Sequence, residues 1–345
     1  MKKQLLIFLL LAPLLGLFMA GMKIYYDLHI QTYDGQEKMF TIKPGETFGS
    51  LNYRLYENDF IKSKKLFHRY SQARGIMTDF KSGDYKIEPG TTMYQMIELF
   101  LSGRSITFPI AIPEGKNLYE IGQLMEDAGF TSAKEFIKWA KDESYMQELG
   151  IDVPTAEGYL FPETYNFSKR ASAKRIISTM VNQYHTKTED LDFSHPVLKN
   201  EHEVITLASV VEKETGASWE RPMIAGVFMN RLNTNMRLQS DPTIIYGIYE
   251  EYKGNLTRRM INQTTPYNTY RIGGLPKGPI ANPGLEAIKA VLSPEMHDFT
   301  YFVSKNDGTH VFSETYKQHL KAVDYWQKTP ANRRGKSWRD LKKEE

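Results

Sequence analysis

Three segments in the N-terminal half of the chain share one local pattern of hydrophobic and polar residues. Each has a short β-like stretch, a turn built on Pro and Gly, and a Thr or Asn that precedes an amphipathic helical period. The predicted helices cover residues 48–57, 93–101 and 118–128. This repetition of strand, turn and helix predicts small α+β units built on one plan.

The pattern changes at about residue 155. Helical periods follow at 173–184, 204–215 and 221–232, and a turn-rich stretch then runs from 236 to 284. A loop region of this length inside a compact domain predicts a functional role. Segments 299–304 and 310–313 flank Asp307-Gly308 and predict a β-hairpin. Residues 155–329 are therefore predicted to form a mixed α/β domain, followed by a charged tail at 330–345.

The first 22 residues have the pattern of a membrane anchor. Lys2 and Lys3 precede an uncharged apolar run from Leu5 to Met22, which is about the shortest run that spans a bilayer. We expect residues 1–4 in the cytoplasm, a single transmembrane helix at 5–22, a stem at 23–38 and the remaining chain outside the inner cell membrane. A cleaved signal peptide is the alternative, although the run ends without a clean small-x-small cleavage site.

Composition and missing motifs exclude several kinds of chemistry. The chain has no cysteine, which excludes disulfides, thiolate metal sites and a cysteine nucleophile. A net charge of only +3 does not predict nucleic-acid binding. His202-Glu203 begins like a zinc-protease motif, but Thr206 stands where the second histidine is needed. We therefore expect neither a metal nor another cofactor.

Two glutamates are the strongest candidates for chemistry. Val204, Leu207, Ala208 and Val211 mark the centre of an apolar helix face, and Glu212 and Glu214 follow in the last turn, separated by about 200° around the helix. The negative end of the helix dipole and partial burial would raise the pKa of a carboxyl group there, as a general acid requires. Both could instead be solvated residues, and periodicity does not choose between them.

Residues 40–61 resemble a LysM-type module, a binder of N-acetylglucosamine polymers. The stretch TIKPGETFGSLNYRLYENDFI carries the resemblance. It implies a LysM-like subdomain at 39–104, which either binds glycan or acts as a spacer, followed by a connecting α+β unit at 105–154. The expected fold class is thus α+β: a transmembrane helix, LysM-like units and the mixed α/β domain.

The second half resembles the endolytic murein transglycosylases, the MltG- or YceG-like family. EGYLFPETY, TLASVVEKETG, VFMNRL, MRLQSDPTIIYG and YNTYRIGGLPKGPIANPG occur in the family's order. Lys277 departs from the pattern, because relatives often have a second proline there. Asp241-Pro242 and Asn282-Pro283-Gly284 either line the cleft or are turns that shape it. The resemblance implies that Glu212 is catalytic and that the following residues bind substrate: Glu157, Glu163, Glu214, Gln239, Asp241, Thr243, Tyr246, Tyr267, Asn268, Thr269 and Tyr270.

The implied activity is endolytic cleavage of the MurNAc-GlcNAc bond in nascent peptidoglycan strands. A single carboxyl group suffices, because the C6 hydroxyl of the sugar attacks C1 and leaves a 1,6-anhydro end that stops elongation. Two alternatives stay open. A water-using muramidase needs a second carboxylate, for which Glu157, Glu163 and Asp241 are candidates, and a non-catalytic scaffold would only bind glycan. The implied partners are peptidoglycan strands and penicillin-binding synthases.

Overall fold

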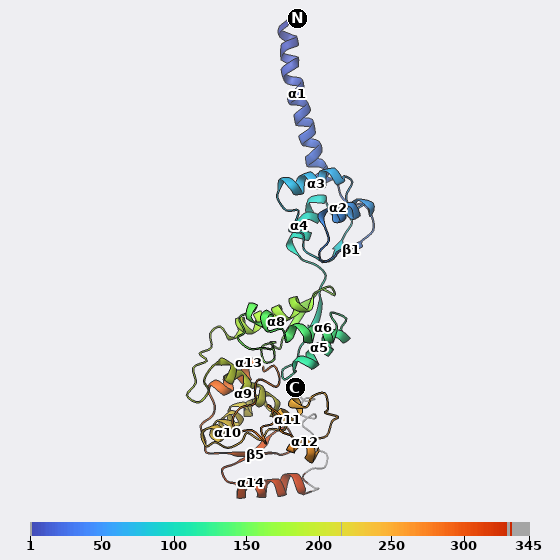
Figure 1. Cartoon of the computed structure of the whole chain (residues 1–345). Helices are drawn as coiled ribbons and strands as arrows, with labels where there is room; N and C mark the ends of the chain where they lie inside the picture. Colours follow the sequence, from blue (N-terminus) through green and yellow to red (C-terminus); the bar gives the residue numbers. More distant parts are fainter. Residues whose placement is uncertain (1, 215, 330–331, 333–345) are drawn as a thin grey trace. The chain divides into compact units, whose positions relative to one another are not determined.

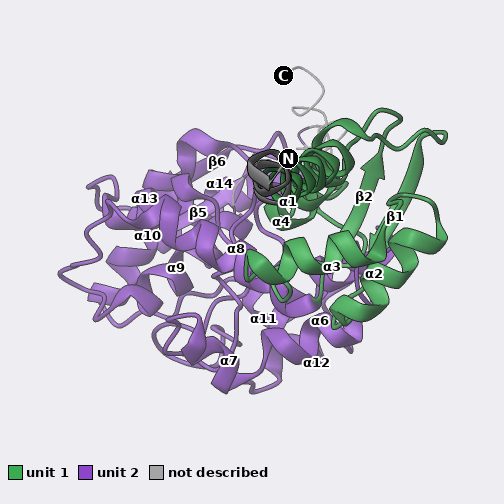
Figure 2. Ribbon diagram, turned by 90° about the horizontal axis from the view of Figure 1, so that it is seen from above, with its two compact units in different colours: residues 1–109, 166–172 green, residues 110–165, 173–345 purple. Residues whose placement is uncertain are grey.

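The computed structural model describes residues 2–214, 216–329 and 332 (Figure 1). The chain forms two compact units, which Figure 2 shows in different colours. Unit 1 contains the chain up to Pro109 together with Asn166–Ser172. Unit 2 contains Ile110–Tyr165 and the chain from Ala173 onward. Most of the predicted connecting segment 105–154 thus falls within unit 2.

Unit 1 is built on a two-stranded antiparallel sheet with helices packed around it. The strands β1 and β2 pair in register from Lys38 opposite Ile87 to Ile42 opposite Gly83. Rings of Phe40, Phe60 and Phe100 lie 5.2–5.8 Å apart in its buried core. Its elements are α1 (Lys2–Tyr25), η1 (Tyr26–Ile30), β1 (Lys38–Ile42), α2 (Phe48–Glu57), α3 (Lys64–Ala73), β2 (Gly83–Ile87) and α4 (Met93–Ser102).

The predicted repetition of strand, turn and helix is confirmed at all three places. β1 leads to α2, β2 leads to α4, and β3 (Phe108–Ala111) leads to α5 (Leu118–Asp127). A glycine with φ between 72° and 88° makes each turn, a backbone conformation that disfavours a side chain. Thr47, Thr92 and Asn117 each cap the following helix through a side-chain oxygen.

The prediction of a membrane anchor is corrected by the structure. Among the residues described, no helix combines the length and the hydropathy needed to cross a bilayer. The transmembrane segment at 5–22 and the inner-membrane localisation that followed from it were therefore wrong.

Unit 2 is mainly helical and contains a hairpin that is followed by two short helices. Strand β3 pairs with β4 (Thr164–Phe167), and the chain passes between the two units along these strands. The predicted hairpin is confirmed as β5 (Tyr301–Ser304) paired antiparallel with β6 (His310–Ser313). The remaining elements are α6 (Ala133–Ala140), α7 (Glu143–Glu148), α8 (Ala173–Thr188), α9 (Glu201–Glu214), η2 (Ser218–Glu220), α10 (Arg221–Asn233), α11 (Asp241–Gly247), α12 (Arg258–Asn262), α13 (Leu285–Leu292), α14 (Tyr316–Val323) and η3 (Asp324–Lys328).

Helix α9 forms the centre of unit 2. It packs against α10, α11 and α13, and every residue from Val204 to Val211 is buried. The sequence pattern predicted a single apolar face, but Ile205, Thr206 and Ser209 on the other sides are buried as well. A helix buried on all sides is a core element. Glu212 and Glu214 follow this buried run at the C-terminal end of α9, so the core fixes their position.

We expect Asn117→Ala to lower the free energy of unfolding by about 1 kcal/mol. The Asn117 side chain accepts hydrogen bonds from the N–H groups of Tyr119 and Glu120, which Ala cannot do. Asn117→Asp keeps the accepting oxygen and should stay within about 0.5 kcal/mol of the parent chain. Chemical denaturation of the three proteins measures the difference, and equal losses in both variants would contradict the capping role.

Candidate active site

Glu212 leaves the end of α9 toward a cluster of charged and backbone groups. One carboxylate oxygen accepts a hydrogen bond from Nη2 of Arg221 at 2.8 Å, and the other accepts one from the Gly284 N–H at 3.1 Å. The same Nη2 also donates to Glu114 at 2.9 Å. The Glu212 side chain is only 6% exposed. Both of its oxygens are therefore occupied, and little of the carboxylate is accessible to a substrate.

Opposing effects act on the protonation of Glu212. The pKa of Glu212 is raised overall: burial raises it most and the nearby Glu114 carboxylate adds to this, whereas Arg221 and the Gly284 N–H lower it. The two donors bind the ionised form, so Glu212 has the contacts of a structural carboxylate. The backbone of Gly284 lies so close to Glu114 that a Cβ at this position would collide with that carboxylate.

Glu214 leaves the same helix end toward a pocket. The pocket has a volume of about 380 Å³, and Glu214 lines it together with Gln239, Asp241 and Tyr270. Burial raises the pKa of Glu214 to about 7 against a hydrogen bond with Ser240; the charge of Asp241 also raises it, and that of Arg231 lowers it. A carboxyl group that is half protonated near neutral pH and borders a pocket has the properties of a general acid.

Asp241 and Gln239 hold defined positions in the same pocket. The Tyr270 hydroxyl donates to Asp241 Oδ1 at 2.7 Å. Gln239 adopts a φ of 49°, which is unusual for a residue with a Cβ. Its N–H donates to the Thr269 carbonyl at 3.3 Å. Local backbone strain of this kind is concentrated at functional sites.

Three of the predicted substrate-binding residues lie beneath this pocket. Thr243, Asn268 and Thr269 are fully buried. The hydroxyls of Thr243 and Thr269 bond each other at 2.8 Å, and the Asn268 amide donates to the carbonyls of Ile261 and Gln263. These contacts use their polar groups within the protein, so these residues shape the loops that carry Gln239, Asp241 and Tyr270.

Glu157 is buried in a second network. Its side chain accepts hydrogen bonds from the Leu118 N–H at 3.0 and 3.2 Å and from Asn282 Nδ2 at 3.0 Å. Burial raises the pKa of Glu157 to about 8 against the hydrogen bonds from Leu118 and Tyr246. With 1% exposure, Glu157 contributes to the protein interior.

The other predicted residues lie apart from the Glu214 pocket. Tyr246 and Tyr267 are ring neighbours at 4.8 Å, and Tyr246 lies 6.4 Å from Tyr119. Glu163 is exposed and pairs with Lys187 at 3.4 Å. The predicted set is therefore split: Glu214, Gln239, Asp241 and Tyr270 share the pocket, and the others do not line it.

Sequence reasoning missed three residues that organise this region. Arg221 and Glu114 surround Glu212, and Arg231 lies near Glu214. Asn282, which the sequence placed in a turn or in the cleft lining, joins Glu157 to neighbouring loops. Their sequence signal was weak, because single charged or amide residues have no diagnostic spacing. The only sign in the sequence that Arg221 and Arg231 are buried was that both lie within the predicted helix at 221–232.

Comparison with known proteins decides the family. The YceG-like family matches residues 40–325. The chain belongs to the YceG-like family. An endolytic murein transglycosylase of Bacillus subtilis is 33% identical over 82% of this chain and 83% of its own length. A protein with the same description from Streptococcus pneumoniae is 27% identical over 82% of this chain, which spans only 57% of that relative.

A solved structure supports the same assignment. A YceG-like protein from Listeria monocytogenes is 28% identical, with a TM-score of 0.54 over 83% of this chain and 98% of its own. In the described part of this YceG-like chain, no group of three or more His, Asp or Glu side chains could hold a metal ion.

We expect Asn282→Asp to destabilise this YceG-like protein by about 3 kcal/mol or more. The Asn282 side-chain oxygen accepts from the N–H groups of Gly158 and Leu160, which Asp can maintain. Its Nδ2 donates to the Lys116 carbonyl and to Glu157, where Asp would place oxygen against oxygen.

Thermal and chemical denaturation measure this loss, with the exposed Asn255→Asp as the control for the added charge. An Asn282→Asp protein as stable as the control would show that the amide network contributes little.

Proposed function

We propose that this chain is an endolytic lytic transglycosylase that cleaves the glycan strands of peptidoglycan, with Glu214 as the acid/base. The support is the family, the relatives described as endolytic murein transglycosylases, and one observation of geometry. That observation is the place of Glu214 in the wall of a pocket of about 380 Å³, where burial raises its pKa to about 7. Such an enzyme is a carbon–oxygen lyase and needs no cofactor.

The reaction uses one carboxyl group twice. Protonated Glu214 gives its proton to the glycosidic oxygen, and the bond between this oxygen and C1 of MurNAc breaks. The C6 hydroxyl of the same sugar then attacks C1, and its proton passes to the Glu214 carboxylate. The products are a 1,6-anhydro end and a free hydroxyl on the departing strand, and Glu214 regains its proton. A pKa near 7 suits both steps, because neither protonation state is strongly favoured.

Glu212 is the catalytic residue that the motif match implies, and its surroundings favour another role. Its carboxylate is bound by Arg221 and the Gly284 N–H, which stabilise the ionised form. We propose that Glu212 holds the loop of Gly284 and the start of α10 against the end of α9, and thereby positions Glu214. Catalysis by Glu212 remains the alternative, and substitution separates the two.

A second candidate function is a water-using muramidase. It requires two carboxylates, and Asp241 lines the same pocket as Glu214. The end groups of digested strands discriminate between the functions, because only the transglycosylase leaves 1,6-anhydro ends and the muramidase leaves reducing ends. The third candidate, a non-catalytic scaffold, would release no product.

Glycan binding by unit 1 is also a proposal. A pocket of about 520 Å³ on this unit is lined by Phe48 and Phe80 together with Glu46, Thr47 and Thr78. Aromatic and polar side chains in one pocket suit an amphipathic sugar, in agreement with the LysM-type resemblance. The predicted association with penicillin-binding synthases stays a prediction.

We expect Glu214→Gln to reduce turnover by about a hundred- to ten-thousand-fold, because the amide cannot deliver a proton. Its stability at neutral pH should be retained or improved, since burial of an ionisable carboxyl is unfavourable. Glu212→Gln should keep most of the turnover per folded molecule. It should lose on the order of 1–3 kcal/mol of stability, because its amide N–H₂ faces the Arg221 or Gly284 donor.

Release of anhydro-muropeptides from purified strands measures turnover, and thermal melts measure folding. A folded but inactive Glu212→Gln protein beside an active Glu214→Gln protein would restore Glu212 as the acid/base. Activity in both variants would place the chemistry elsewhere.

The pH profile provides an independent test of Glu214. As the initial proton donor it must be protonated, so kcat/KM should fall as the pH rises through about 7. Asp241→Asn removes a charge that raises the pKa of Glu214 and keeps an oxygen that accepts from Tyr270. We therefore expect the fall of kcat/KM with rising pH to occur at a lower pH in this variant. The exposed Asp190→Asn is the control with the same change of charge. If kcat/KM fell at the same pH in the parent and Asp241→Asn proteins, Asp241 would have no effect on the pKa of Glu214.

A further inference from the structure

The Glu214 pocket has a second wall, which none of the recognised motifs includes. Strand β5 contributes Tyr301 to it, and helix α14 contributes Tyr316 and His319. Positions 316 and 319 are one helical turn apart and lie on the same side of α14. A segment about 100 residues beyond Glu214 in the sequence thus borders the same space.

The three rings form a contiguous aromatic surface. The Tyr301 and His319 rings stack with centroids 5.2 Å apart and planes 24° apart. Tyr316 lies 5.8 Å from Tyr301 and 6.2 Å from His319. Despite these contacts Tyr316 is 59% exposed, so much of its surface remains available to a ligand.

His319 adds an uncharged ring to this surface. Burial lowers its pKa, and the nearby Arg231 lowers it further, so the imidazole is neutral at physiological pH. Within the described residues its Nδ1 is buried and has no hydrogen-bond partner. Its contribution to the pocket is therefore that of a flat, weakly polar ring.

The two walls match the two faces of a sugar ring. Glu214, Gln239 and Asp241 provide polar groups for hydroxyl and N-acetyl groups. The rings of Tyr301, Tyr316 and His319 provide an apolar surface for the C–H face of a pyranose. We propose that these three side chains form a stacking subsite for an N-acetylhexosamine unit of the glycan, with Tyr316 as its main contact. This proposal rests on the proposed function, because it assigns the substrate of the same pocket.

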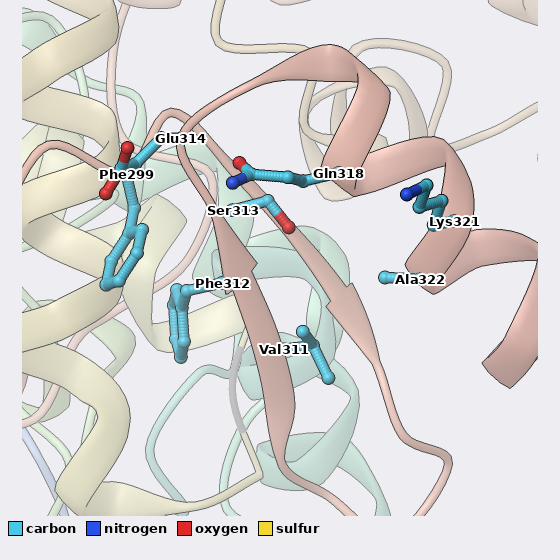
Figure 3. Close-up of a pocket in the computed structure, with 8 residues that line it drawn as sticks. All are labelled: Phe299, Val311, Phe312, Ser313, Glu314, Gln318, Lys321 and Ala322. Carbon is cyan, nitrogen blue, oxygen red and sulfur yellow. The ribbon is translucent and has the colours of Figure 1, made fainter.

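The other side of α14 offers a matched control. Gln318, Lys321 and Ala322 face a separate pocket of about 320 Å³, which they line with Val311, Phe312 and Ser313 of β6 (Figure 3). Lys321→Ala therefore alters the same helix without altering the stacking surface. Tyr316→Phe retains the ring and removes only the hydroxyl.

The test measures binding of chitohexaose, the β-1,4-linked N-acetylglucosamine hexamer, by calorimetry. The full-length Glu214→Gln protein serves as the parent, so that binding is read without cleavage. We expect Tyr316→Ala to weaken Kd by about 3- to 10-fold. Tyr316→Phe should stay within about twofold of the parent, as expected for loss of a solvent-exposed hydroxyl, and Lys321→Ala should match the parent. In the wild-type background, Tyr316→Ala should raise KM for glycan strands and leave kcat nearly unchanged.

Unchanged Kd in Tyr316→Ala would overturn the proposal, as would equal weakening in Lys321→Ala. Absence of chitohexaose binding by the parent protein would overturn it too. Thermal melts exclude unfolding as the cause of a weaker Kd. The proposed function fails in a different way, namely when wild-type protein binds the sugar but releases no anhydro ends.

Discussion

The side-chain amide of Asn282 holds together the loops on which the site depends. Its oxygen accepts from the N–H groups of Gly158 and Leu160, and its nitrogen donates to Lys116 and Glu157. The Asn282 backbone also accepts from the Gly115 N–H. Asn282 thus joins two segments, around Lys116 and around Glu157, that lie more than a hundred residues before it in the sequence. Buried polar networks of this kind stabilise a structure only when each member is satisfied, and Asn282 satisfies all four of its own bonding positions.

This arrangement determines the surroundings of the two glutamates. Gly284 follows Asn282 by two residues and donates to Glu212, while Glu114 lies next to Gly115 and shares Arg221 with Glu212. The end of α9 is thus attached on one side to a closed cluster of ion pairs. On its other side Glu214 meets an open pocket. Two carboxyl groups two residues apart thus have different surroundings. Burial raises the pKa of both, but Glu212 is bound by Arg221 and the Gly284 N–H, whereas Glu214 borders a pocket beside Asp241.

The Glu214 pocket is lined by segments from different parts of the sequence. Its polar groups come from the turn-rich stretch at 239–270, whose backbone is held by the buried Thr243, Asn268 and Thr269. Its aromatic groups come from the hairpin and α14. A sugar polymer has polar edges and apolar ring faces, so a pocket with one wall of each kind suits this class of substrate. Glu214, the proposed acid/base, borders this pocket at the end of the central helix.

Much of the local structure could be predicted from the amino-acid sequence by itself. The three repeats of strand, turn and helix, the helices of unit 2 and the final hairpin depend on capping residues, glycine turns and apolar periods, which act over a few residues. The family motifs implied Glu212 as the catalytic residue, whereas periodicity did not choose between Glu212 and Glu214. The surroundings that distinguish the two glutamates come from Arg221, Gly284 and Asp241, which approach only in the folded chain. It also gave no indication that Tyr301, Tyr316 and His319 share a pocket with Glu214. Desolvation and ion pairing depend on which distant groups become neighbours, and only the tertiary structure decided that.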